Sequence, residues 1–256
     1  MLPRFRYSKA VSSVARVILR RPFLVAQKVL ARAGFRFERA FNPDGTARSI
    51  YDALSPAPIR TIFDVGANVG AMSLKFASSF PEAEIFSFEP VQATFEVLYR
   101  RMTSAHIHPI RAAVGRRSGT AKIEIIAPCA QRNRIRERCD GASETVPMTT
   151  IDDFCREHSI GSIDILKSDT EGHEIEVLSG ADRMLGSTRF VLVEFGLSCL
   201  ADEQHAPFEA IHDVLSSRGF RLASIYELRH RKHDQRFVFG NALYMNSHET
   251  TSFGSM

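Results

Sequence analysis

The sequence of 256 residues predicts an α/β fold, in which a mostly parallel sheet carries helices on both faces. From residue 59 onward, short apolar segments alternate with segments whose apolar residues recur at helical spacing. In addition, the stretch TIFDVGANVGAMSLKF at residues 61–76 reads as an apolar strand, a glycine turn and an amphipathic helix. Such a turn is typical of nucleotide-binding strand–helix units.

Seven segments have the length and apolar content of buried strands. In chain order they are Ile59–Val65, Glu84–Glu89, His108–Val114, Ile163–Asp169, Phe190–Phe195, Phe220–Tyr226 and Phe237–Met245. Helices are expected between them at residues 71–79, 91–103, 150–158, 173–185 and 207–218. Thr150-x-x-Asp153 resembles a capping box, and Pro90 suits a first helical turn. Consecutive strands joined by helices run parallel, so their carboxyl ends should meet at one edge of the sheet.

The charge of the chain is unevenly distributed. Residues 1–40 hold ten Lys and Arg residues and one acid, Glu38, although the whole chain carries a net charge of only +4. Apolar residues within 11–33 recur at helical spacing. We therefore divide the chain into a basic helical N-terminal arm with a linker (residues 1–48) and a mildly acidic domain (residues 49–256). The arm could lie on an anionic membrane surface, act as a transit peptide, or pack with its charges solvated.

Composition excludes several classes of protein. No segment approaches the roughly 18 uninterrupted apolar residues that a membrane-spanning helix needs. The four cysteines are widely spaced and form no C-x-x-C motif, which makes a structural zinc site unlikely. A Cys129–Cys139 disulfide is conceivable, but free thiols in a reducing cytosol are favoured. We therefore expect a cytoplasmic protein, with peripheral membrane contact through residues 1–40 as an option.

Acidic residues end four of the expected strands: Asp64, Glu89, Asp169 and Glu194. The turn Gly66-Ala67-Asn68-Val69-Gly70 matches neither the P-loop pattern nor the G-x-G-x-x-G pattern of dinucleotide-binding proteins. Asp64 would repel a pyrophosphate on this turn but would suit a ligand with positive charge. S-adenosylmethionine meets that demand, because it has no phosphate and carries an ammonium and a sulfonium.

Glu89 follows Gly70 by 19 residues, where a carboxylate can accept hydrogen bonds from both ribose hydroxyls. The turn backbone and Asn68 can bind the methionyl part of the same cofactor. The expected cofactor-binding residues are Asp64, Gly66, Ala67, Asn68, Gly70 and Glu89.

The chain resembles the FkbM-type, S-adenosylmethionine-dependent methyltransferases over roughly residues 60–196. The matching pieces are IFDVGANVG (62–70), FSFEP (86–90), AAVGRRSGTA (112–121), TTIDDF (149–154), IDILKSDTEGHEIEVLSGADRML (163–185) and FVLVEFG (190–196). The D-x-E-G-x-E piece at residues 169–174 is the most specific. Ser168, Thr170 and His173 depart from the residues usual in the family, which could alter the acceptor pocket. The resemblance implies a class I methyltransferase fold, with seven strands of which the last is antiparallel. It also implies O-methylation of a hydroxyl on a sugar or a natural product.

Asp169 is the first candidate for the general base that removes the hydroxyl proton, and Glu171 and His173 follow on the same turn as further catalytic candidates. Structural roles compete with this interpretation. Ser168-x-x-Glu171 could form a capping box, and Glu174 could stabilise the positive end of a helix dipole. Lys167 could pair with one of these acids or contact the acceptor.

Asp169, Glu171 and Glu194 could instead bind Mg²⁺, but no ligand set in the sequence is specific enough to assign a metal site. The expected partner is a small molecule with a hydroxyl group. The alternative is an RNA or protein methyltransferase that docks through its basic arm. The basic segments 132–138 and 228–236 lack the interleaved aromatic residues of nucleic-acid-binding surfaces, which weakens the RNA interpretation. Asp64 argues against a third option, an NAD(P)-dependent enzyme.

Overall fold

A computed structural model describes residue 54 and residues 58–126, 134–135, 141–197, 205–230 and 237–247. The basic arm and linker predicted at residues 1–48 lie outside the described residues, as do Cys129 and Cys139. Within the described ranges, no helix is both long enough and apolar enough to cross a membrane.

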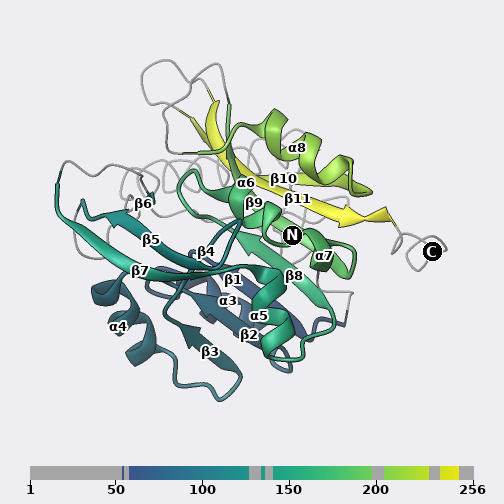
Figure 1. Cartoon of the computed structure of the whole chain (residues 1–256). Helices are drawn as coiled ribbons and strands as arrows, with labels where there is room; N and C mark the ends of the chain where they lie inside the picture. The colour runs from purple at the N-terminus through teal and green to yellow at the C-terminus, as the bar shows by residue number, and fades with distance from the viewer. Residues whose placement is uncertain are drawn as a thin grey trace, which may run out of the picture. The chain divides into compact units, whose positions relative to one another are not determined.

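The main sheet has seven strands in the order β10-β11-β9-β8-β1-β2-β3 (Figure 1). Their bounds are β1 (Thr61–Val65), β2 (Glu84–Phe88), β3 (Ile107–Ile110), β8 (Ile163–Ser168), β9 (Thr188–Gly196), β10 (Phe220–His230) and β11 (Phe237–Asn246). Strand β1 pairs in parallel with β2 and with β8, while β11 lies antiparallel between β9 and β10. The prediction of a mostly parallel sheet with an antiparallel last strand is confirmed.

Apolar clusters cover both faces of this sheet. Neighbouring residues of β1 point to opposite sides, because side chains alternate along a strand. Ile62 packs in a cluster with Phe76 of α3 (Ala71–Ser79), and Phe63 packs in another with Leu215 of α8 (Phe208–Ser216). The second cluster also receives residues from α5 (Ile151–Glu157), α6 (Glu174–Ser179) and α7 (Asp182–Leu185). The expected double-sided burial is therefore confirmed.

Two helix predictions need correction. The helix predicted at residues 173–185 is interrupted, so that α6 ends at Ser179 and α7 begins at Asp182. A Cβ atom at Gly180 would lie 2.0 Å from the carbonyl oxygen of Gly115, so this break holds two backbone segments in close contact. Pro90 does not occupy a first helical turn, because α4 (Gln92–Arg101) begins after Val91.

By contrast, the predicted cap at Thr150 is confirmed. The Thr150 hydroxyl accepts a hydrogen bond of 2.9 Å from the amide N–H of Asp153, the third residue of α5. This bond satisfies one of the amide groups that the first turn of a helix leaves unpaired.

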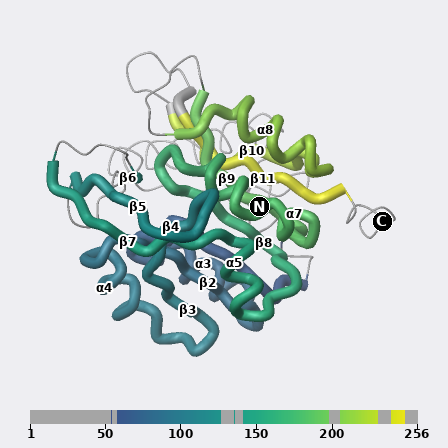
Figure 2. The backbone as a smooth tube through the Cα atoms, viewed as in Figure 1, coloured from purple at the N-terminus to yellow at the C-terminus, as the bar shows by residue number. Residues whose placement is uncertain are grey.

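A second sheet, with strand order β4-β7-β5-β6, was not predicted. Its strands are β4 (Ala113–Val114), β5 (Gly119–Glu124), β6 (Arg134–Ile135) and β7 (Ser143–Thr149). The strand predicted at 108–114 is in fact divided between β3 of the main sheet and β4 of this one. Figure 2 shows β5 and β7 running side by side, in agreement with their antiparallel pairing. The alternation of Ala121 and Ile123 with polar residues was a signal for β5 in the sequence.

Candidate active site

A pocket opens where β1, β2 and β8 end. Its lining comes from the ends of these strands, from the connections that follow them, and from β4, β5 and β6 of the second sheet. The lining residues are Val65, Gly66, Asn68, Phe88, Glu89, Pro90, Val91, Ala112, Ala113, Val114, Ile123, Ile135, Asp169, Thr170, Glu171 and His173. Of the nine residues predicted from the sequence for cofactor binding or catalysis, the lining includes six: Gly66, Asn68, Glu89, Asp169, Glu171 and His173. Asp64, Ala67 and Gly70 lie outside the lining.

The glycine turn after β1 is fixed to the strands on both sides. The amide N–H groups of Gly66 and Ala67 both donate to the carbonyl oxygen of Phe88, at 3.1 and 2.9 Å. Gly66 has a φ of +79°, and a Cβ atom there would lie 1.8 Å from the carbonyl oxygen of Asp169. Only glycine permits this approach, so the turn rests directly on the backbone that follows β8.

Asp64 lies beneath this turn and is fully buried. One of its oxygens accepts a 2.6 Å hydrogen bond from the Ser73 hydroxyl, and the other lies 3.0 Å from the Lys167 ammonium. Lys167 also lies 3.4 Å from a carboxylate oxygen of Asp169, which confirms the prediction that this lysine pairs with an acid. Because Lys167 neutralises Asp64, a phosphate in this pocket would be repelled by the acids on the lining, Glu89, Asp169 and Glu171, and not by Asp64. A role for Asp64 in cofactor binding stays a prediction.

Glu89 follows β2 directly and presents both carboxylate oxygens to backbone amides. One oxygen accepts from Val91 N–H at 3.0 Å and the other from Asn68 N–H at 3.1 Å. Burial raises the pKa of Glu89 to about 7, although these amides and Lys167 oppose the shift. An ionised carboxylate has about four lone-pair sites. Each Glu89 oxygen can therefore accept a second hydrogen bond, which suits a vicinal diol.

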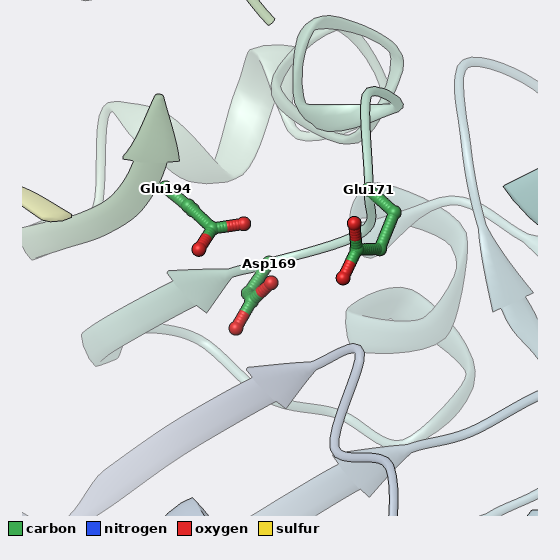
Figure 3. Close-up of side chains that lie close together, drawn as sticks. All are labelled: Asp169, Glu171 and Glu194. Atoms are coloured by element: carbon green, nitrogen blue, oxygen red, sulfur yellow. The ribbon is translucent and has the colours of Figure 1, made fainter. Parts of the chain in front are cut away.

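Three carboxylates, those of Asp169, Glu171 and Glu194, form what we call the acidic cluster (Figure 3). An oxygen of each lies within 4.8 Å of an oxygen of the other two. Burial, with the nearby Glu194 and Asp169, raises the pKa of Glu171 to about 8. Burial also raises the pKa of Glu194 to about 7, against the influence of His205. The cluster therefore binds protons or another positive charge near neutral pH.

Glu174 has a structural role, in agreement with the structural alternative that the sequence analysis gave for it. Its first oxygen accepts from the amide and hydroxyl of Thr170 and from the amide of Gly172, at 2.8, 3.0 and 3.2 Å. Its second oxygen accepts from Ala206 N–H at 3.2 Å. The proposed capping box from Ser168 to Glu171 is wrong, because α6 begins only at Glu174 and the Ser168 hydroxyl makes no hydrogen bond to the described residues.

His173 lines the pocket at the start of α6. Its Nδ1 atom lies 3.7 Å from a carboxylate oxygen of Glu176. Burial lowers the pKa of His173, with Arg116 acting in the same direction and Glu176 against it. The neutral imidazole is therefore favoured at pH 7, where it can donate or accept a hydrogen bond on the pocket lining.

Sequence reasoning missed His205 and the two isoleucines of the second sheet, Ile123 and Ile135. His205 Nε2 lies 3.3 Å from a Glu194 oxygen, and its ring stacks on Phe239 at 4.6 Å between centroids. No motif or spacing in the sequence links His205 to the strand ends. The period-two pattern of β5 could have indicated Ile123.

The raised pKa values predict how stability depends on pH. Glu194 has a higher pKa in the folded chain than in the unfolded chain, so its contribution is present below pH 4.5 and is lost as the pH rises through about 7. Between pH 5 and pH 8, Glu194→Gln should therefore gain roughly 2 kcal/mol of unfolding free energy relative to the unsubstituted chain. Urea denaturation across this range measures the difference. The exposed Glu157→Gln provides the control, and an equal pH slope for all three proteins would contradict the assignment.

Comparisons with known proteins show to which family this chain is related. The family model described as the methyltransferase FkbM domain matches residues 64–222. The hexuronic acid methyltransferase AglP of Haloferax volcanii is 30% identical over 52% of this chain and 54% of its own length. The 2-O-methyltransferase NoeI of Sinorhizobium fredii is 28% identical over 64% of this chain and 74% of its own length. The chain thus matches about half of the first relative and about three quarters of the second.

Among solved structures, the magnesium protoporphyrin IX methyltransferase of Synechocystis PCC 6803 aligns over 77% of this chain and 78% of its own. The TM-score is 0.45 and the sequence identity 10%.

Proposed function

Since the chain belongs to the FkbM methyltransferase family, we propose that it transfers a methyl group from S-adenosylmethionine to a hydroxyl group of a sugar. One relative is named for a hexuronic acid and another for 2-O-methylation, and together the names support an oxygen acceptor on a sugar. The observation that carries the proposal is the position of Asp169, which lines the pocket and touches the glycine turn through its own backbone.

The charges and hydrogen-bonding groups on the pocket lining support the proposed cofactor. The absence of a side chain at Gly66 lets the turn rest on the backbone of Asp169, and Gly66, Asn68 and Glu89 all lie on the lining. Asp169 and Glu171 on the same lining oppose a phosphate and favour a cationic ligand. S-adenosylmethionine supplies a methyl group bound to a positively charged sulfur. Glu89 would hold the ribose hydroxyls, and Asn68 with the turn backbone would hold the methionyl part.

The residues of this chain then have to orient the acceptor and remove one proton. The acceptor oxygen would gain a bond to the methyl carbon while the bond from that carbon to sulfur breaks, which leaves a neutral thioether. The hydroxyl proton would pass to an oxygen of Asp169. Lys167, 3.4 Å from Asp169, keeps this carboxylate oriented toward the strand end. Ile123 and Ile135 of the second sheet shield the other side of the pocket from water.

An acceptor screen tests the proposed function. The chain would be incubated with methyl-labelled S-adenosylmethionine and, separately, with free and glycosidically linked hexuronic acids, neutral hexoses, RNA and a mixture of proteins. We expect label in a sugar ether, with unchanged yield after deletion of residues 1–40. Label confined to RNA or protein, and lost with that deletion, would instead support the macromolecular alternative.

Asp169→Asn tests the role of the base. We expect kcat to fall roughly 10²–10⁴-fold, because the amide cannot accept the proton, while calorimetry shows cofactor affinity within a few-fold of the unsubstituted value. Asp213→Asn on the exposed side of α8 is the matched control and should leave both quantities unchanged. A kcat within about threefold of the unsubstituted value would remove Asp169 from the reaction.

A further inference from the structure

Glu194 and His205 form a buried pair directly behind Asp169. We propose that His205, acting through Glu194, is a positioning residue that sets the pH range over which Asp169 accepts the proton of the acceptor hydroxyl. The inference rests on the proposed function, and it extends the proton-accepting site to two residues that do not line the pocket.

The geometry connects the three side chains in a row. Asp169 and Glu194 belong to the acidic cluster, and Figure 3 shows Glu194 on its strand facing Asp169 at the end of the neighbouring one. An oxygen of Glu194 lies 3.3 Å from His205 Nε2, and both side chains are about nine-tenths buried. Asp169, by contrast, is 35% exposed at its side chain, so it is the member that an acceptor can reach.

His205 is held in this place by several contacts. Its ring stacks on Phe239 with an angle of 12° between the planes. The next residue, Ala206, accepts a hydrogen bond from Gly196 N–H at 2.9 Å and donates one to Glu174 at 3.2 Å. A Cβ atom at Gly196 would lie 3.0 Å from the Cβ atom of His205, so the end of β9 and this segment are closely packed. The imidazole is therefore a fixed part of the site.

The charges around Glu194 explain why a histidine matters there. Burial and the neighbouring Asp169 favour a protonated Glu194, whereas His205 favours the ionised form. Besides His205, the charged groups that act on the acidic cluster are Lys167 of β8 and Glu174 of α6. Glu227 of β10 lies one residue further away, because it accepts a hydrogen bond from Asn241, which stands opposite Glu194 on β11. When the three carboxylates of the acidic cluster already share a proton, they accept a second proton poorly. An imidazolium beside Glu194 leaves the cluster free to take the proton from the acceptor at a lower pH.

The proton balance of the step is simple. The hydroxyl proton moves to Asp169, which shares it with Glu194 within the acidic cluster, and the proton then leaves to water from the exposed side of Asp169. His205 changes neither the number of protons transferred nor the bond that forms. His205 lowers the pH above which the acidic cluster is deprotonated and can accept the hydroxyl proton.

The test uses His205→Asn, Glu194→Gln and the double variant, each in the 256-residue chain. We expect His205→Asn to move the acidic limb of the kcat profile upward by roughly 0.5–1 pH unit, with little change in kcat at about pH 9 or in cofactor affinity. In the Glu194→Gln background the same substitution should cause no further shift. His106→Asn is the matched control, because His106 pairs with Glu84 at 2.7 Å at the opposite end of β2.

A second readout does not depend on turnover. The NMR titration of the His205 imidazole in the unsubstituted chain should have its midpoint lowered in Glu194→Gln by about 0.5 unit or more, because the substitution removes an adjacent negative charge. This measurement needs no acceptor, so failure of the sugar screen and failure of this inference can be told apart.

Two results would overturn the inference. A uniform loss of kcat in His205→Asn, with the acidic limb unmoved and no change in the imidazole titration of Glu194→Gln, would make His205 merely structural. Activity abolished by EDTA and restored by Mg²⁺, with metal binding lost in Glu194→Gln, would assign the acidic cluster to a divalent cation.

Discussion

Replacing Gly66 with valine should abolish cofactor binding and destabilise the fold by roughly 3 kcal/mol or more. A branched side chain is strained at a φ of +79°, and its Cβ atom would collide with the carbonyl oxygen of Asp169. Because the obstacle is backbone, neither partner can give way without moving the turn or the end of β8. Calorimetric titration with S-adenosylmethionine and urea denaturation would measure the two effects.

Gly161→Val is the matched control for this substitution. A Cβ atom at Gly161 meets no described atom within 4 Å, and its backbone does not have the positive φ of Gly66. We expect the control to retain cofactor binding and most of its stability. Micromolar cofactor binding by Gly66→Val would show that the turn is not the cofactor cradle.

Lys167→Met should lower the free energy of unfolding by about 3–5 kcal/mol, because it leaves the buried Asp64 carboxylate without its cation. Lys167 is 3% exposed and lies between Asp64 and Asp169. Burial lowers the pKa of Lys167, but the two carboxylates more than offset this effect and the net shift is upward. The lysine is therefore charged throughout the accessible pH range.

The double variant Asp64→Asn with Lys167→Met separates charge from packing. If the uncompensated carboxylate causes the loss, the double variant should recover most of it, since the side-chain amide introduced by Asp64→Asn can still accept the hydrogen bond from Ser73. Lys75→Met, on the exposed side of α3, should change stability by less than about 0.5 kcal/mol. A loss in Lys167→Met that the double variant does not reduce would point to packing.

The strand ends could be predicted well because the two features that define them, apolar runs and turn glycines, are local in the sequence. The apolar runs and the turn glycines define where β1, β2, β8 and β9 lie, and parallel connectivity then brings Glu89, Asp169 and Glu194 to one edge. Asp64 shows where this reasoning stops. Its partner Lys167 stands directly opposite it in the β1–β8 register, and register between distant strands is not a local property.

The features that were not predicted depend on tertiary contacts. β4 and β6 are two residues long, too short to leave a periodic pattern. The break between α6 and α7 follows from the approach of Gly180 to Gly115, which belongs to a segment 65 residues earlier. His205 lies beside Glu194 in a segment that Ala206 holds through hydrogen bonds with Gly196 and Glu174, residues distant from it in the sequence.

The acidic cluster has a consequence for the electrical balance of turnover. Transfer of a methyl group from a sulfonium to a hydroxyl removes one positive charge from sulfur and releases one proton. Lys167 lies between Asp64 and Asp169, and its single positive charge cannot neutralise both carboxylates. The remaining negative charge of the acidic cluster therefore needs a counter-charge before and after the reaction. In the proposed reaction, the sulfonium would supply this counter-charge before the methyl transfer and the proton would supply it afterwards. The net charge of the site would thus stay nearly constant through the proposed chemical step.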